Sequence, residues 1–214
     1  MKQKAVIFDM DGVLIDSEPL WQEAQIDTLK SFNVHITRHD CEELTMGKRL
    51  DDIAQTWLKT YTLPVSVNVL AERILGILCD RIVTTGKAMT GVKQALDYFT
   101  KQEMKIALAT SSHHLVIKAV FDRLKLHDKF SVVCSAEDEQ KGKPAPDVYL
   151  TAAYRLQLPV HECVVIEDSL TGLTAAKTAD MTTYLVSPQH KHAKFKMADY
   201  RYANLLDLID DIDT

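Results

Sequence analysis

The chain of 214 residues lacks the features that mark membrane, disulfide-rich or low-complexity proteins. No apolar run approaches the length of a membrane helix, and the N-terminus has no charged-then-apolar signal pattern, so we expect a cytoplasmic protein without a membrane partner. It has only four widely spaced cysteines, without a Cys-x-x-Cys pair, for which we expect reduced and mostly buried thiols. Seven glycines and six prolines are too few for a collagen-like or disordered chain.

Positively charged residues are outnumbered by acidic residues. Lysine and arginine number 25 against 30 acidic residues, for a net charge of −5, which argues against a nucleic-acid-binding surface. Any phosphate ligand must therefore be held by local cations. The basic cluster from His190 to Lys196 is predicted to be a solvated surface segment. Nothing indicates oligomerisation, and we expect a monomer.

Short apolar runs alternate with helical patterns over most of the chain. This alternation predicts an α/β protein, a Rossmann-like three-layer fold with a parallel sheet and right-handed crossovers. The predicted strands are 5–8, 105–109, 131–134, 163–166 and 182–186, and the predicted helices are 93–101, 116–124, 146–156, 170–179 and 205–212.

A helical insert interrupts this pattern after the first strand. From about Glu18 to Val83 the apolar residues recur at helical spacing, with a break at 60–64, which predicts four or so helices. We therefore predict an α/β core made of residues 1–15 and 85–214, and a helical domain made of residues 16–84.

Two carboxylates follow the first predicted strand. Asp9 and Asp11 are two residues apart, so in an extended segment their side chains leave on the same side, and Gly12 permits a sharp turn. Such close acids repel unless a cation or a proton separates them. The residues alone are consistent with a Mg²⁺ site, with an acid pair that divides nucleophile and proton donor, or with exposed turn aspartates.

The later polar motifs follow other predicted strands, at the same sheet edge as Asp9. Thr110 and Ser111 stand before a helix, where a hydroxyl and backbone N–H groups can bind an anion, although a simple helix cap is the alternative. Lys143 precedes Pro144 in a stiffened loop, and Glu167 and Asp168 add two acids that favour a cation among them.

Taken in order, these motifs resemble the four signatures of the haloacid dehalogenase-like hydrolase superfamily, and Asp-Met-Asp-Gly-Val-Leu-Ile-Asp-Ser fits its branch of β-phosphoglucomutase and sugar phosphatases. The resemblance makes the helical insert a cap domain. It implies Asp9 as nucleophile, Asp11 as general acid/base, and Thr110, Ser111 and Lys143 as the phosphoryl-binding residues. It further implies Mg²⁺ bound by Asp9, the backbone carbonyl of Asp11 and Asp168, with Glu167 a ligand or near neighbour.

The implied function is a Mg²⁺-dependent phosphomonoesterase that hydrolyses small sugar phosphates, such as hexose, deoxyhexose or hexitol phosphates, through an aspartyl-phosphate. A β-phosphoglucomutase is the main alternative, but the mutases carry histidine where this chain has Trp21. Residues 17–21 resemble the cap entry of bacterial hexitol- and 2-deoxyhexose-phosphate phosphatases. Three further alternatives are less favoured. A dehalogenase would not need Asp11, and a phosphonatase would need a cap lysine that forms a Schiff base, which no lysine of the insert stands out as. An inactive binding protein would lack the nucleophile or the metal-binding acids, and all of these are present.

Within the insert, residues 46–49 are predicted to form a substrate-facing loop. Lys48 or Arg49 would contact the sugar phosphate, and Arg49 is our candidate, although a solvated helix start is the alternative. Trp21 is either a platform for the sugar or a packed core residue. The His113–His114 pair and the pair of His190 and His192 lack a third metal ligand and are predicted to be exposed.

Overall fold

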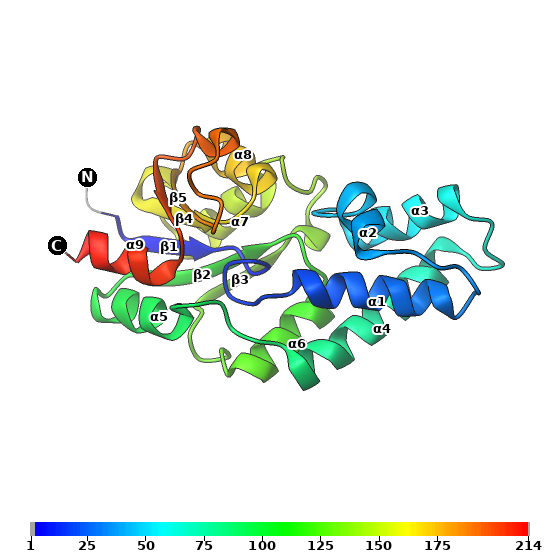
Figure 1. Ribbon diagram of the computed structural model, residues 1–214. Helices are drawn as coiled ribbons and strands as arrows, with labels where there is room; N and C mark the ends of the chain where they lie inside the picture. Colours follow the sequence, from blue (N-terminus) through cyan, green and yellow to red (C-terminus); the bar gives the residue numbers. More distant parts are fainter. Residues whose placement is uncertain (1–2, 214) are drawn as a thin grey trace.

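A computed structural model describes residues 3–213 and shows an α/β core with a helical domain beside it (Figure 1). Six strands form one sheet: β1 (Ala5–Phe8), β2 (Lys105–Thr110), β3 (Val132–Ser135), β4 (Cys163–Glu167), β5 (Thr182–Val186) and β6 (Tyr200–Tyr202). The core helices are α5 (Val92–Lys101), α6 (His114–Leu124), α7 (Asp147–Leu156), α8 (Leu170–Thr178) and α9 (Leu205–Ile212). The short 3-10 helices are η1 (Ala136–Asp138), η2 (Val160–Glu162) and η3 (Ala193–Phe195).

All strand pairs are parallel, in the order β3-β2-β1-β4-β5-β6. After β1, the chain adds β2 and β3 on one side of it. It then crosses to the other side of β1, where it adds β4, β5 and β6. A parallel sheet binds ligands beyond the carboxyl ends of its strands where the order reverses. This point lies at Phe8, immediately before Asp9.

The two faces of the sheet are covered by different helices, as strand alternation requires. Ala5 and Ile7 of β1 belong to one apolar cluster with residues of α7 and α8. Val6 and Phe8 belong to another, with residues of α5, α6 and α9. Figure 1 shows α7 and α8 above the sheet and α5 below it. This arrangement confirms the predicted three-layer fold.

The insert folds into four helices, which form the cap: α1 (Glu18–Lys30), α2 (Arg38–Leu44), α3 (Leu50–Thr60) and α4 (Val67–Thr85). Its apolar interior is continuous with the lower face of the sheet, because α4 packs along α6 (Figure 1). The last turn of α4 thus reaches the position at which we predicted the core to resume.

Two linkers join the cap to the core and run side by side. Ile15 and Ala88 face each other in an antiparallel bridge. On either side of it, Asp16 N–H donates to the carbonyl of Lys87 and Met89 N–H donates to that of Leu14, each over 3.0 Å. The chain therefore leaves the core and re-enters it at one place.

Some details differ from the sequence-based prediction. The prediction missed β6, a mostly exposed three-residue strand that pairs with β5 at the edge of the sheet. All four cysteines are free, as predicted, and three are buried while Cys79 is half-buried. In the described part of the chain, no helix combines the length and apolar character needed to cross a membrane.

Candidate active site

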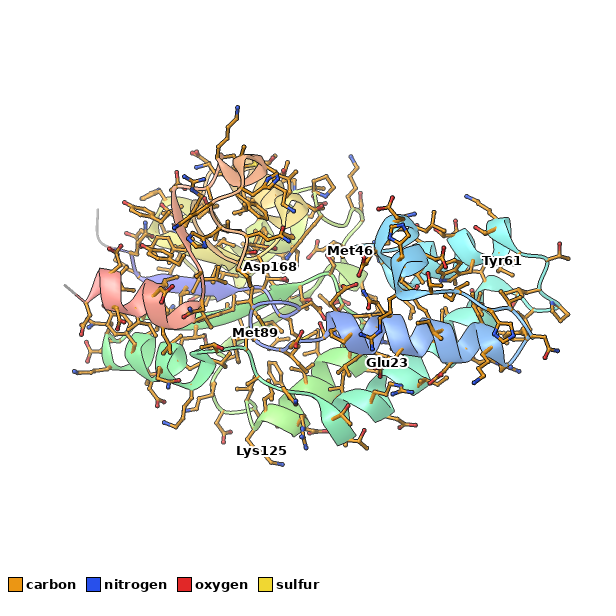
Figure 2. The ribbon with its side chains drawn as sticks, in the orientation of Figure 1. Glu23, Met46, Tyr61, Met89, Lys125 and Asp168 are labelled. Carbon is orange, nitrogen blue, oxygen red and sulfur yellow. The ribbon has the colours of Figure 1, made fainter. Side chains whose placement is uncertain are left out.

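A cavity of about 460 Å³ lies between the carboxyl edge of the sheet and the cap. The residues of all four predicted signatures line it: Asp9, Asp11, Thr110, Ser111, Lys143, Glu167 and Asp168. The cap contributes Trp21 and the loop at Met46, and Figure 2 shows Asp168 in the core and Met46 on the side of the cap that faces it. Strand ends separated by up to 160 residues in the chain thus share one site because the sheet is parallel.

Lys143 is the central cation of this site. Its Nζ donates to Asp9 Oδ1 over 2.8 Å, to Glu167 Oε1 over 2.7 Å and to the carbonyl of Ala109 over 3.1 Å. It also lies 4.8 Å from the centre of the Tyr149 ring. Burial alone would lower the pKa of Lys143, but the two carboxylates outweigh it and hold the pKa well above its usual range. The ammonium therefore stays charged.

Glu167 is a fully hydrogen-bonded acid. Oε1 accepts from Lys143 and, over 2.8 Å, from the Tyr149 hydroxyl. Oε2 accepts from the backbone N–H of Asp168 and of Ser169, and from the Ser169 hydroxyl, at 2.9–3.0 Å. Burial would raise the pKa of Glu167, but Lys143 and these donors lower it. With its lone pairs engaged, Glu167 is better suited to fix Lys143 and the β4 end than to bind a metal directly.

Asp9 and Asp168 keep oxygens free for a cation. Lys143 engages only Oδ1 of Asp9, and within residues 3–213 no hydrogen bond to the Asp168 carboxyl is found. Carboxylate oxygens of Asp9, Glu167 and Asp168 lie within 4.8 Å of one another. Burial raises the pKa of Asp9 to about 7 despite Lys143, and burial with the neighbouring acids raises that of Asp168 well above its usual range. These buried carboxylate oxygens have too little positive charge around them. They therefore fit Mg²⁺, which prefers a few carboxylate ligands and retains waters.

Asp11 is held by donors from both domains. Oδ1 accepts from the Ser17 hydroxyl over 2.5 Å and from the indole N–H of Trp21 over 3.3 Å, and Oδ2 accepts from the Ser112 hydroxyl over 2.6 Å. Ser17 and Trp21 belong to the cap entry, whereas Ser112 follows β2. The orientation of Asp11 thus depends on how the cap is seated.

The turn after β2 presents hydroxyls and backbone N–H groups to the cavity. Thr110 is buried at the end of β2, and its hydroxyl accepts from the Ser112 N–H over 3.1 Å. Ser111 lines the cavity. The helix cap that we considered for Ser111 or Ser112 is supplied by His113, whose side chain accepts from the N–H of Leu115. The serines are therefore left for other partners.

The two candidate cap residues, Lys48 and Arg49, differ in whether their side chains face the cavity. Lys48 lines the cavity, whereas the side chain of Arg49 packs on Gly142 of the core: a Cβ at Gly142 would lie 3.0 Å from Arg49 Cδ. Arg49 is not among the residues that line the cavity. Trp21 is half-buried: it packs against the apolar core and also lines the cavity, and its role as a platform for the sugar stays a prediction.

Among residues 3–213, no histidine belongs to a group of side chains with metal-binding geometry. His113 pairs with Glu137 over 2.8 Å and His114 with Asp138 over 2.9 Å, which ties the start of α6 to η1. His113 is partly buried rather than fully exposed, with 30% of its side-chain surface accessible. Among the described residues, the acids at the ends of β1 and β4 are the only group with metal-binding geometry.

Sequence reasoning missed several residues that shape the site. Tyr149 was not singled out, because a buried tyrosine in a helix carries no signal of its own. Ser112 was considered only for its backbone N–H and as a helix cap, not as a donor to Asp11. Ser17 formed part of the first motif, but its contact with Asp11 depends on the turn at Gly12, which has a φ of 74°.

The family model described as haloacid dehalogenase-like hydrolase matches residues 6–186. The chain belongs to this family. It is 34% identical over 208 residues to hexitol phosphatase B of Escherichia coli K12, covering 95% of this chain and 93% of that protein. It is 32% identical to the phosphorylated carbohydrates phosphatase of Thermotoga maritima over 176 residues, or 82% and 81% of the two chains.

A solved structure of β-phosphoglucomutase from Clostridium difficile superimposes with a TM-score of 0.80, covering 99% of this chain and 98% of that chain. Their sequence identity is 23%, so this likeness shows the fold alone. Together, the comparisons confirm the resemblance drawn from the motifs, the haloacid dehalogenase-like fold and the prediction that the chain is a hydrolase.

Proposed function

We propose that this haloacid dehalogenase-like hydrolase is a Mg²⁺-dependent phosphomonoesterase that hydrolyses small sugar phosphates through an aspartyl-phosphate. The observation that carries the proposal is the arrangement around Asp9: its Oδ1 is held by Lys143, and the open oxygens of Asp168 lie beside it. Asp11, held separately by three donors, is available as a second acid with a different role.

In this mechanism the free oxygen of Asp9 attacks the phosphorus atom, while Lys143 offsets the charge of nucleophile and phosphate. Thr110 and Ser111, with the N–H groups of their turn, bind the phosphoryl oxygens. Asp9 and Asp168 would hold Mg²⁺, which would supply further charge neutralisation there. Asp11 donates a proton to the departing alcohol and then takes one from the water that hydrolyses the aspartyl-phosphate.

The names of the relatives guide the choice of substrate. One is a hexitol phosphatase and another a phosphatase of phosphorylated carbohydrates, and both match most of this chain. We therefore propose hexose, deoxyhexose and hexitol 6-phosphates as the preferred class. Trp21, in place of the histidine that the mutases carry, favours transfer to water over transfer to a sugar hydroxyl.

The test is phosphate release with Mg²⁺ from phosphorylated hexoses, deoxyhexoses, hexitols and nucleotides, run beside an isomerisation assay with β-glucose 1-phosphate. We expect release concentrated on the 6-phosphates. Isomerisation without release would replace the phosphatase with a mutase, and a preference for nucleotides would overturn the substrate class.

A further inference from the structure

The segment Ser187–Phe195, which we call the core loop, forms part of the cavity wall. It belongs to the α/β core but lies outside the four signature motifs. Most of the loop is exposed, as predicted for the basic cluster. However, Ser187, Gln189, Lys194 and Phe195 line the cavity. Lys194 is exposed, as predicted, and it also faces the proposed substrate site.

Lys194 is presented by a well-anchored turn. Its neighbour Phe195 is buried and packs with residues of α8 and β5, so that η3 is fixed on the core (Figure 1). The ring of His192 accepts from the Lys194 N–H over 3.1 Å, and Lys194 Nζ lies 4.8 Å from the centre of the Phe195 ring. The ammonium group is thus held at the wall by its own turn.

Within the described residues, Lys194 also has no carboxylate partner. Three lysines line the cavity, and only Lys143 forms ion pairs with acids. In the described chain, no carboxylate lies within ion-pair distance of Lys194 or of Lys48, whose Nζ donates to the Thr56 hydroxyl over 3.1 Å. Both lysines are exposed, and each places a positive charge at the cavity wall that no carboxylate of the described chain balances, so the two lysines suit a ligand that brings its own negative charge.

The transferred phosphate does not need these lysines, because it is bound through Lys143 and the turn at Thr110. The cavity of about 460 Å³ is in the range of complete small-molecule sites and has room for more than a phosphoryl group. We propose that Lys194 of the core loop, with Lys48 of the cap, forms a second anion subsite. It binds a negatively charged group at the end of the substrate remote from the transferred phosphate.

This inference rests on the proposed function and extends its substrates, beside the uncharged hexose and hexitol 6-phosphates, to open-chain sugar acids carrying a 6-phosphate or to sugar bisphosphates. The shared chemistry is an anionic end group, and the two sources differ in whether that group is a carboxylate or a phosphate. The core loop, and not the cap alone, then determines specificity.

The experiment compares wild type with Lys194→Met on hexitol 6-phosphate, 6-phosphogluconate and glucose 1,6-bisphosphate. Lys196→Met is the matched control, since Lys196 lies in the same basic segment, is exposed and does not line the cavity. Loss of one charge-assisted hydrogen bond should raise KM about tenfold for at least one doubly anionic substrate, with kcat little changed. The loss on hexitol 6-phosphate should stay below about threefold.

The substrate that carries the loss identifies the end group as carboxylate or phosphate. An equal loss on all three substrates, or none on any, overturns the subsite. Calorimetric binding of the same compounds to Asp9→Asn protein, with and without Lys194→Met, decides the subsite without turnover. If binding shows the expected discrimination but wild type releases no phosphate, the proposed hydrolysis fails and the subsite stands.

Discussion

The indole N–H of Trp21 donates to Asp11 Oδ1 across the junction of cap and core, over 3.3 Å. Trp21 lies in the first turn of α1, whereas Asp11 lies three residues beyond Phe8, the last residue of β1. The same oxygen accepts from Ser17, and the other carboxylate oxygen accepts from Ser112 of the core. An indole can only donate, so this contact keeps Oδ1 in the role of acceptor whenever the cap is seated as observed.

Trp21→Phe should therefore lower kcat about tenfold, the order expected for one lost hydrogen bond at the reacting acid. The substitution keeps an aromatic ring in place but removes the donor. Phosphate release across a substrate series, with kcat and KM separated, measures the effect.

Trp57→Phe is the matched control, because Trp57 is the only other tryptophan and donates to Gln25 inside the cap. It should lower the free energy of unfolding by about 1 kcal/mol without reducing kcat. Equal losses of kcat in both variants would mean that the cap as a whole, and not the contact with Asp11, sets the rate.

Asp9→Asn should reduce turnover more than about a thousandfold, since the amide cannot form the acyl phosphate. The fold should persist, because Lys143 retains its bond to Glu167. Phosphate release and circular dichroism measure the two outcomes. An active, folded Asp9→Asn enzyme would rule out Asp9 as nucleophile.

Binding of Mg²⁺ should weaken as the pH falls from about 8 to 6 and should release protons over this range. The reason is the buried Asp9 carboxyl, whose pKa is raised from 3.8 to about 7 in the metal-free protein and which must lose its proton to bind a cation. Titration calorimetry in two buffers of different ionisation enthalpy measures the protons released. Affinity independent of pH would contradict this assignment.

The same raised pKa has a consequence for stability. The native metal-free protein binds the Asp9 proton more tightly than the unfolded chain does, so this contribution is present at pH below 3.8 and is lost as the pH rises through about 7. Added Mg²⁺ should therefore stabilise the protein more at pH 8 than at pH 5, as measured by thermal unfolding.

Gly172→Ala should displace Glu167 and thereby disrupt the site. A Cβ at this position would lie 1.6 Å from Glu167 Oε1, so Glu167 and its bond to Lys143 would have to move. We expect a loss of about 2–3 kcal/mol of stability from overpacking, together with lower activity.

Gly76→Ala offers a control in α4, where nothing lies within 4 Å of the added methyl. It should raise stability by up to about 1 kcal/mol, as expected in a helix interior. Chemical denaturation compares the two variants. A tolerated Gly172→Ala would show that Glu167 does not need its observed position.

The sequence allowed the sheet and the site to be predicted together, because each polar motif directly follows a buried apolar run. Parallel pairing then places the ends of such runs at one edge, which brings Asp9 and Asp168 together. The unpredicted part depends on geometry that neighbouring residues do not encode. β6 exists because β5 offers it a pairing edge, and its sequence Tyr-Arg-Tyr has no apolar run.

The cap loop illustrates the same limit at the level of single side chains. Lys48 and Arg49 are adjacent and chemically alike, yet only Lys48 lines the cavity while Arg49 packs on Gly142. Which of them turns inward depends on the left-handed turn at Gly47, with a φ of 72°. Likewise, nothing in the basic cluster distinguishes Lys194 from Lys196 until Phe195 anchors the turn.

The paired linkers at Ile15 and Ala88 make the cap an insertion that both leaves and re-enters the core at one point. Because the chain departs and returns at one place, helical inserts of different length or design could be exchanged there without altering the order of the strands. The apolar seam between α4 and α6 sets the condition on such an exchange, since any replacement must cover α6. Substrate preference can thus change by substitution of one contiguous piece of chain, provided that the new piece keeps the donors that Ser17 and Trp21 supply to Asp11.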